Sequence, residues 1–192
     1  MRRIMFSLII VILLLVFTAN AVLAGGVIKV GADVGGEVKF TLKEAGFLPE
    51  TIKNDTEMGF SLGAELFNDV NETFTVGVGV EYQLKRKNEG AVKGFNFIPI
   101  YALGRFHVDP SFFLTGKVGY NLYLQEDLPE ELKTKGGLFF GFGGGAVLSD
   151  MVQLELLYSI HNGKFELKED PGVDYDMSWK YTKIGISVGF FF

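Results

Sequence analysis

Apolar and polar residues alternate along most of this chain. Over residues 28–42, the even-numbered positions are apolar or small, and the odd-numbered positions are charged residues, threonine or glycine. Because successive side chains of a strand point to opposite faces, this pattern predicts a strand with one apolar and one polar face. Ordinary strands have about five or six residues, whereas a tilted membrane strand needs about nine to eleven. The length of the pattern therefore favours a membrane strand.

The same alternation recurs seven more times along the chain. The repeats are residues 58–66, 74–84, 98–106, 112–124, 138–148, 152–160 and 184–192. The repeat at 98–106 is the least regular, because Pro99 has no N–H for a ladder hydrogen bond. We expect a bulge there, at which Phe95 and Phe97 change faces. The chain is thus predicted to form eight strands.

Short and long connections alternate between the predicted strands. The short links are residues 67–72, 108–111 and 149–150, and the long polar links are 43–55, 85–93, 125–135 and 162–177. Outer-membrane barrels have short turns on the periplasmic side and long loops outside. With an even number of strands, both ends of the barrel are then expected in the periplasm.

The two faces of the strands distinguish a membrane barrel from a soluble one. A soluble barrel packs its apolar face inward, and eight strands could not enclose so many Phe, Leu and Tyr side chains. Lipid outside and a polar lumen inside accommodate both faces. We therefore predict an all-β fold, an eight-stranded antiparallel up-and-down transmembrane β-barrel. Its predicted lumenal charges are Asp33, Glu65, Glu81, Arg105, Lys117, Glu155 and Lys183.

The first 24 residues have the order of a secretory signal peptide. Arg2 and Arg3 precede an uncharged apolar run over residues 4–17, and small residues suited to cleavage end at Ala24. The run is shorter than the roughly 17 to 25 residues of a membrane-spanning helix. We predict a cleaved signal peptide at 1–24 and a barrel domain at 25–192, with an uncleaved anchor as the alternative.

Composition narrows the classes of function. The chain has no cysteine, which excludes disulfides, thiolate metal sites and a lipid-modified thiol. Without Arg2 and Arg3, 16 basic residues (18 minus 2) stand against 23 acidic ones, a net charge of −7. A nucleic-acid partner is therefore not expected.

The end of the chain carries a likeness to a known family. Apolar residues occupy alternate positions at Ile186, Val188, Phe190 and Phe192. This pattern resembles the C-terminal signal of bacterial outer-membrane barrels, which the barrel-assembly machinery reads in that family. Residues 137–159, a glycine-rich strand and its partner around a Ser-Asp turn, resemble the paired late strands of small eight-stranded members.

The whole predicted barrel is similar in pattern to the OmpA transmembrane domain, OmpX and opacity-type surface proteins. The resemblance implies a location in the bacterial outer membrane, in contact with its lipids and lipopolysaccharide. It also implies a lumen filled by ion pairs, which in some members can open as a small gate. Plain filling of a narrow lumen is the alternative to a gate.

No pattern of residues indicates catalysis. Small lipid A deacylases use a His-x-Ser motif with a glutamate, but His161 is followed by Asn162 and Gly163, and Ser159 precedes it. Ser159 and His161 also face the predicted lumen, whereas a lipid-cleaving site must meet the bilayer. His107, the other histidine, is predicted on a different strand. We assign no catalytic, cofactor or metal-binding residue.

Two further features suggest contacts with the membrane surface. The basic segment Lys85-Arg86-Lys87 is expected near lipopolysaccharide phosphates. A set of aromatic residues near strand ends is expected to form interfacial girdles. These residues are Tyr82, Tyr120, Tyr123, Tyr158, Trp179 and Tyr181.

These observations predict an integral outer-membrane protein with a structural or surface-interaction role. Four external loops would determine its extracellular partner, which the sequence does not identify. A narrow pore for ions or small solutes is the alternative, and a lipid-modifying enzyme is the third hypothesis.

Overall fold

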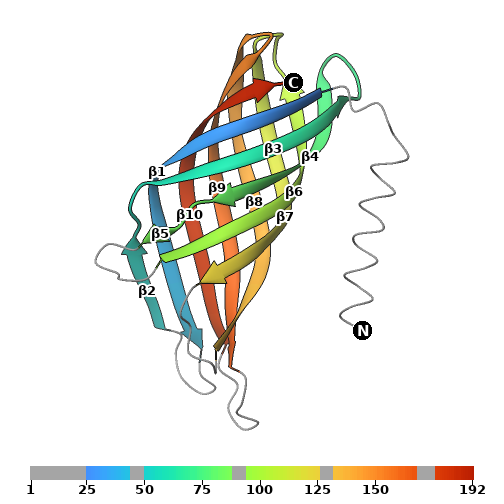
Figure 1. The fold of residues 1–192 in the computed structure, drawn as a ribbon. Helices are drawn as coiled ribbons and strands as arrows, with labels where there is room; N and C mark the ends of the chain where they lie inside the picture. Colours follow the sequence, from blue (N-terminus) through green and yellow to red (C-terminus); the bar gives the residue numbers. More distant parts are fainter. Residues whose placement is uncertain (1–24, 44–49, 88–93, 126–131, 168–175) are drawn as a thin grey trace.

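The chain folds into a closed antiparallel β-barrel (Figure 1). The computed structural model describes residues 25–43, 50–87, 94–125, 132–167 and 176–192. The predicted signal peptide, residues 1–24, lies outside the described residues. In the described part of the chain, no helix is long and apolar enough to cross a membrane.

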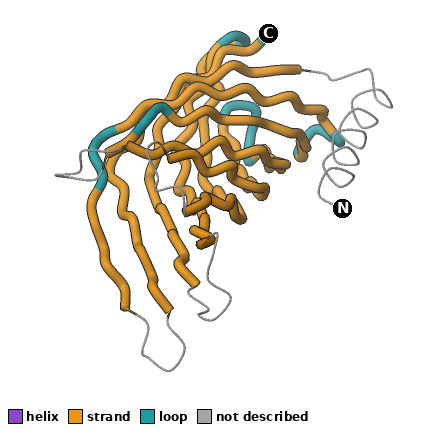
Figure 2. Tube along the Cα trace, turned by 60° about the horizontal axis from the view of Figure 1, so that its bottom comes forward, coloured by secondary structure: helices purple, strands orange, loops and turns teal. Residues whose placement is uncertain are grey.

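Strands form the wall of the barrel (Figure 2), and eight of them are long. They are β1 (Gly25–Lys43), β3 (Gly59–Asp69), β4 (Phe74–Gln83), β6 (Gly94–His107), β7 (Phe112–Gln125), β8 (Leu132–Ser149), β9 (Val152–Leu167) and β10 (Asp176–Phe191). Each pairs with its neighbour along the chain, and β10 pairs with β1 to close the barrel. The predicted eight-stranded up-and-down barrel is therefore confirmed.

Two short strands extend the wall. β2 (Glu50–Asp55) pairs with β1, and β5 (Arg86–Lys87) pairs with β6. Both lie within segments that the sequence predicted as loops. β8, β9 and β10 also continue into the predicted long links, because the alternating pattern of the sequence weakens there while the ladder pairing persists. The wall is therefore taller than predicted.

The two ends of the barrel differ in their connections. The turn end carries three tight turns together with Gly26 and Phe192, whose backbones exchange two hydrogen bonds at the seam. In two of these turns an acceptor side chain, Asn71 or Asp109, binds two following amides at 2.7 to 2.9 Å. Such Asx turns stabilise short connections. The opposite rim, on which β2 and β5 lie, is called the loop end.

The apolar side chains cover the outside of the barrel. Outward residues such as Phe60, Leu156 and Phe142 are more than half exposed, whereas their strand neighbours point inward and are buried. On β9 the outward apolar residues run over 152–160, which at about 3.3 Å per residue and a tilt of about 40° spans roughly 20 Å between the first and last Cα atoms. This height is close to the apolar band of about 25 Å in outer-membrane barrels.

The first strand departs from its predicted faces. One extra residue of β1 is inserted between Asp33 and Gly36, where the register against β10 shifts. This bulge exchanges the two faces, so Val38 is fully buried in the lumen and Lys39 points outward. The prediction of one uninterrupted apolar face over residues 28–42 is therefore wrong.

Pro99 has a different effect from the predicted one. The register between β6 and β7 is unbroken from Phe95 to His107, so Phe95 and Phe97 face inward like Tyr101 and do not change faces. The break lies on the other side of β6, where pairing with β4 stops at Ile100. The amide of His107 donates to the carbonyl of Thr73, just before β4. Every second residue of β6 directs its N–H toward β4, and Pro99 is at one of these positions. Because proline has no N–H, the ladder with β4 cannot extend there.

Candidate functional site

The barrel lumen contains two clusters of buried ion pairs. At the centre of the first cluster, Glu65 accepts from Lys29 at 3.1 Å, Arg105 at 2.6 Å and Lys117 at 2.7 Å. Glu155 faces the same lysines and lies 2.7 Å from Lys117 Nζ, while its other ion pair is with Lys29. These five residues come from β1, β3, β6, β7 and β9, so the cluster ties together distant parts of the wall.

The second cluster lies beside the first, closer to the loop end. Lys183 Nζ is 2.8 Å from Asp33 Oδ1 and 3.0 Å from Glu81 Oε1. The guanidinium of Arg86, fully buried, forms an ion pair with Asp33 and donates to the carbonyl of Phe60 at 3.2 Å. Buried charges are costly unless they are paired, and this network supplies the partners.

Aromatic rings contact the charged side chains in the lumen. The guanidinium of Arg105 lies 4.8 Å from the ring centroids of both Phe67 and Phe113. Tyr101 donates its hydroxyl to Glu65 at 2.9 Å, and Gly79 leaves the room that its ring occupies. A cavity of about 20 Å³ remains among the charged residues, enough for about one water molecule.

A polar layer around His161 continues the filling toward the loop end. His161 Nδ1 lies 2.9 Å from Asn121 Oδ1, and Nε2 lies 3.2 Å from Ser159 Oγ and 3.1 Å from Gln83 Nε2. Serine, histidine and asparagine in this order resemble a nucleophile, a base and a group that orients it. All three are buried within the lumen, and the adjacent cavity is too small for an acyl substrate.

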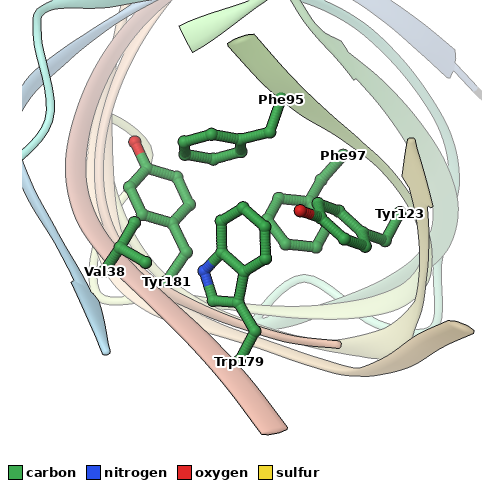
Figure 3. Close-up of a cluster of buried hydrophobic side chains, with 6 residues drawn as sticks. All are labelled: Val38, Phe95, Phe97, Tyr123, Trp179 and Tyr181. Atoms are coloured by element: carbon green, nitrogen blue, oxygen red, sulfur yellow. The ribbon is translucent and has the colours of Figure 1, made fainter. Parts of the chain in front are cut away.

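An aromatic cluster lies in the lumen on the loop-end side of this layer (Figure 3). Trp179 is at its centre, with ring centroids 4.4 Å from Tyr123 and 4.6 Å from Phe95. Phe97 stacks on His161 at 5.2 Å and so connects the aromatic cluster to the polar layer. The full cluster is Val38, Phe95, Phe97, Tyr123, Trp179 and Tyr181.

The predicted lumenal residues all point into the barrel. Asp33, Glu65, Glu81, Arg105, Lys117, Glu155 and Lys183 each have an ion-pair partner there. Sequence reasoning missed Lys29 and Arg86. Lys29 shares the parity of Asp33 on β1, so the alternation could have found it. Arg86 follows an irregular segment after Gln83, so parity could not have placed it.

Two other predictions about the membrane surface are partly wrong. Arg86 is buried in the lumen, because Asp33 needs a cation, and is not at the lipid surface. Among the predicted girdle residues, Tyr82 and Tyr120 are exposed on the outside, but Tyr123, Trp179 and Tyr181 are buried inside. Tyr123 is an even number of residues from Lys117 on β7, and Trp179 and Tyr181 are an even number from Lys183 on β10. Side chains at such positions share one face of a strand, so all three rings point inward.

The C-terminal residues lie on the outside of the seam. Ile186, Phe190 and Phe192 are exposed on the apolar surface, and Val188 is half-buried beside them. Ile186, Val188 and Phe190 stand opposite Ala32, Val30 and Ile28 of β1. The last apolar residues of the chain are therefore at the turn end, where the barrel closes.

The acidic and histidine side chains in the described part of the chain are not arranged as a metal site. No group of three or more His, Cys, Asp or Glu side chains there has an arrangement that could hold a metal ion. The acidic lumenal side chains are instead paired with lysine and arginine.

The chain belongs to the outer membrane protein beta-barrel domain family, whose sequence model matches residues 9–192. It is thus a β-barrel protein of the bacterial outer membrane. No curated protein matches it in sequence.

Several solved structures are similar to this chain at low sequence identity. Ail, the attachment invasion locus protein of Yersinia pestis, is 16% identical with a TM-score of 0.44, over 87% of this chain and 99% of that one. OprG of Pseudomonas aeruginosa is 15% identical with a TM-score of 0.49, over 88% and 96%. Neisserial surface protein A is 18% identical with a TM-score of 0.40, over 84% and 96%.

Proposed function

We propose that this protein is a non-conducting membrane scaffold that presents its loop end to the cell exterior. The observation that supports this role is the filled lumen, in which ion pairs, a polar layer and aromatic rings follow one another along the axis. An ion would have to displace several buried, paired side chains to pass. The fold is used as a rigid support, and the loops would contact the extracellular partner.

The two ends of the chain and the apolar wall would bring the protein to the membrane and hold it there. Residues 1–24 would direct export and be removed. The outward residues Ile186, Val188, Phe190 and Phe192 would be read by the barrel-assembly machinery, and the apolar wall would contact outer-membrane lipids and lipopolysaccharide. Catalysis has no place in this account.

Recording from planar bilayers tests the scaffold against a pore. Folded protein of residues 25–192 is inserted, and insertion is checked by the heat-dependent gel mobility typical of membrane barrels. We expect no discrete current steps from the wild-type protein. Steps that change when lumenal Lys117 is replaced by Gln, but not when exposed Lys85 is replaced, would establish a pore and contradict the proposal.

A lipid-hydrolase role rests on the Ser159, His161 and Asn121 arrangement alone. These side chains face the lumen, whereas a lipid-cleaving site must meet the bilayer. We expect purified barrel to leave lipid A and phospholipids unchanged. Lipid cleavage by the wild type that is lost in His161→Ala would contradict the scaffold proposal and support an enzyme.

A further inference from the structure

A groove on the outer wall near the loop end is lined by three lysines. It has a volume of about 580 Å³, within the range of small-ligand sites. Lys39 of β1, Lys180 of β10 and Lys164 of β9 contribute the positive charge, and among the described residues none that lines the groove is acidic. Hydroxyl and amide groups of Thr41, Ser178 and Asn162 lie between them.

These lysines belong to the outside of the barrel. Val38 precedes Lys39, and Trp179 precedes Lys180, and both preceding side chains are buried in the aromatic cluster of the lumen. Because strand neighbours point to opposite faces, Lys39 and Lys180 point outward. The bulge in β1 creates this arrangement, since without it Lys39 would face the lumen.

The register places like charges side by side. Lys39 stands directly opposite Lys180 on one neighbouring strand and opposite Lys53 on the other. Directly opposed like charges destabilise a sheet. Glu37 offsets part of the charge through ion pairs with Lys39 at 2.9 Å and Lys53 at 3.9 Å. Among the ion pairs of the described residues, it is one carboxylate for the row of Lys53, Lys39 and Lys180. Such a row becomes favourable when a bound anion bridges the lysines.

The groove lies at the height of the lipid headgroups. Ile160 is the last outward apolar residue of β9 and stands opposite Thr182 of β10. Lys180 lies two residues before Thr182, toward the loop end. Two residues advance the strand by about 7 Å. The headgroup layer on each side of a bilayer core is about 5 to 7 Å thick. The lysines therefore meet the membrane where phosphate groups are found.

The groove also continues into the apolar wall. Gly136 and Gly137 of β8 line it next to a register shift in that strand. Leu138 follows at the membrane edge and is 56% exposed. A ligand with phosphate at one end and hydrocarbon at the other would match both parts.

We propose that this groove binds the phosphorylated headgroup of an outer-leaflet glycolipid, with its acyl chains against the wall at Leu138 and Ile160. The inference rests on the outer-leaflet position of the loop end in the proposed function. It does not depend on whether the lumen conducts, because the groove is on the outer wall. Its failure is therefore distinguishable from the failure of the scaffold proposal.

Native mass spectrometry with bisphosphorylated lipid A tests the site. Protein folded in neutral detergent is titrated with lipid A, with the same lipid lacking its phosphates, and with inorganic phosphate as a competitor. A lysine at an anionic membrane surface contributes about 1 kcal/mol, which is about fivefold in affinity. We expect Lys180→Gln to weaken lipid A binding about fivefold and Lys39→Gln/Lys180→Gln about 25-fold. The matched control Lys180→Arg keeps the positive charge in the groove and should bind within about twofold of the wild type.

The melting temperature provides a second readout that a general folding defect would not reproduce. Without lipid A, Lys180→Gln should melt higher than the wild type, because it removes a repulsion with Lys39. With lipid A the order should reverse. Equal lipid A affinity of the double variant and the wild type would overturn the proposal. So would equal binding of the lipid without phosphates, or full displacement by millimolar inorganic phosphate, which would identify a site for free anions.

Discussion

Lys183 of the last strand and Asp33 of the first strand form an ion pair across the seam of the barrel, with Nζ 2.8 Å from Oδ1. The two residues are 150 positions apart in the chain. Main-chain pairing of β1 with β10 closes the barrel, and this ion pair adds a side-chain link in the lumen. Asp33 also holds Arg86, so one carboxylate connects β1, β10 and the short β5.

Replacing Asp33 by Asn should destabilise the barrel strongly. The change leaves the buried guanidinium of Arg86 without its ion-pair partner, and removal of one partner from a buried pair costs about 3 to 5 kcal/mol. Urea unfolding in lipid vesicles, followed by gel mobility of unboiled samples, measures the loss. Asp150→Asn, in the exposed turn between β8 and β9, is the control and should unfold like the wild type. An equal midpoint for the two variants would show that the seam pair contributes nothing.

Replacing Glu65 by Gln should also cost about 3 to 5 kcal/mol. Glu65 is fully buried and accepts from Lys29, Arg105 and Lys117, so its loss leaves Glu155 as the remaining carboxylate of that cluster. The same urea series measures the effect, with Glu72→Gln in an exposed turn as the matched control. If both variants unfold at the wild-type urea concentration, the cluster is solvated and the lumen is not tightly filled.

The two faces of the strands could be predicted from the alternation alone where no residue is inserted. On β3, β4, β7 and β9 the outward apolar and inward polar residues are as the parity indicates. The alternation of apolar and polar residues does not reveal where one extra residue is inserted. The bulge near Gly36 therefore reversed the predicted faces of β1 beyond that point. The sequence also could not give the partners of each charge, because these depend on the stagger of strands that are far apart in the chain.

The aromatic cluster in the lumen also could not be predicted from the sequence. Tyr123, Trp179 and Tyr181 have inward parity, but aromatic residues near strand ends are equally typical of the interfacial girdle. Only the position of Val38 and Phe97 opposite them shows that these rings pack against one another. Arg86 required the three-dimensional structure, since its strand has two residues and follows a break in the ladder.

Gly79 and Gly116 should respond oppositely to alanine. A Cβ at Gly79 would lie 2.6 Å from the Tyr101 ring and 2.9 Å from Glu65 Cγ, whereas at Gly116 it would meet nothing within 4 Å. Overpacking costs about 1 to 3 kcal/mol, and removing glycine at an unstrained position gains about 0.5 kcal/mol. We expect Gly79→Ala to lower and Gly116→Ala to raise the free energy of unfolding in urea. The same sign for both would contradict the assigned inward and outward faces.

Trp179 is the single tryptophan of the chain and reports on its own location. Its side chain is 2% exposed inside the barrel. Its fluorescence should therefore be quenched only weakly by lipids brominated along their acyl chains. A variant with Trp179→Phe and Tyr120→Trp carries the tryptophan on the outer wall and should be quenched strongly. Equal quenching of the two proteins would place Trp179 at the lipid surface.

The most direct test of a lipid-facing wall around a filled lumen is a spin-label scan along β9 in lipid vesicles. Single cysteines are introduced into this cysteine-free chain at Leu154, Leu156, Leu157, Ser159 and Ile160, and collisions with oxygen and with a water-soluble nickel complex are measured. We predict high oxygen accessibility at Leu154, Leu156 and Ile160, and low accessibility to both reagents at Leu157 and Ser159. High nickel accessibility at Leu157 and Ser159 would reveal a water-filled lumen, and the absence of alternation would contradict the barrel itself.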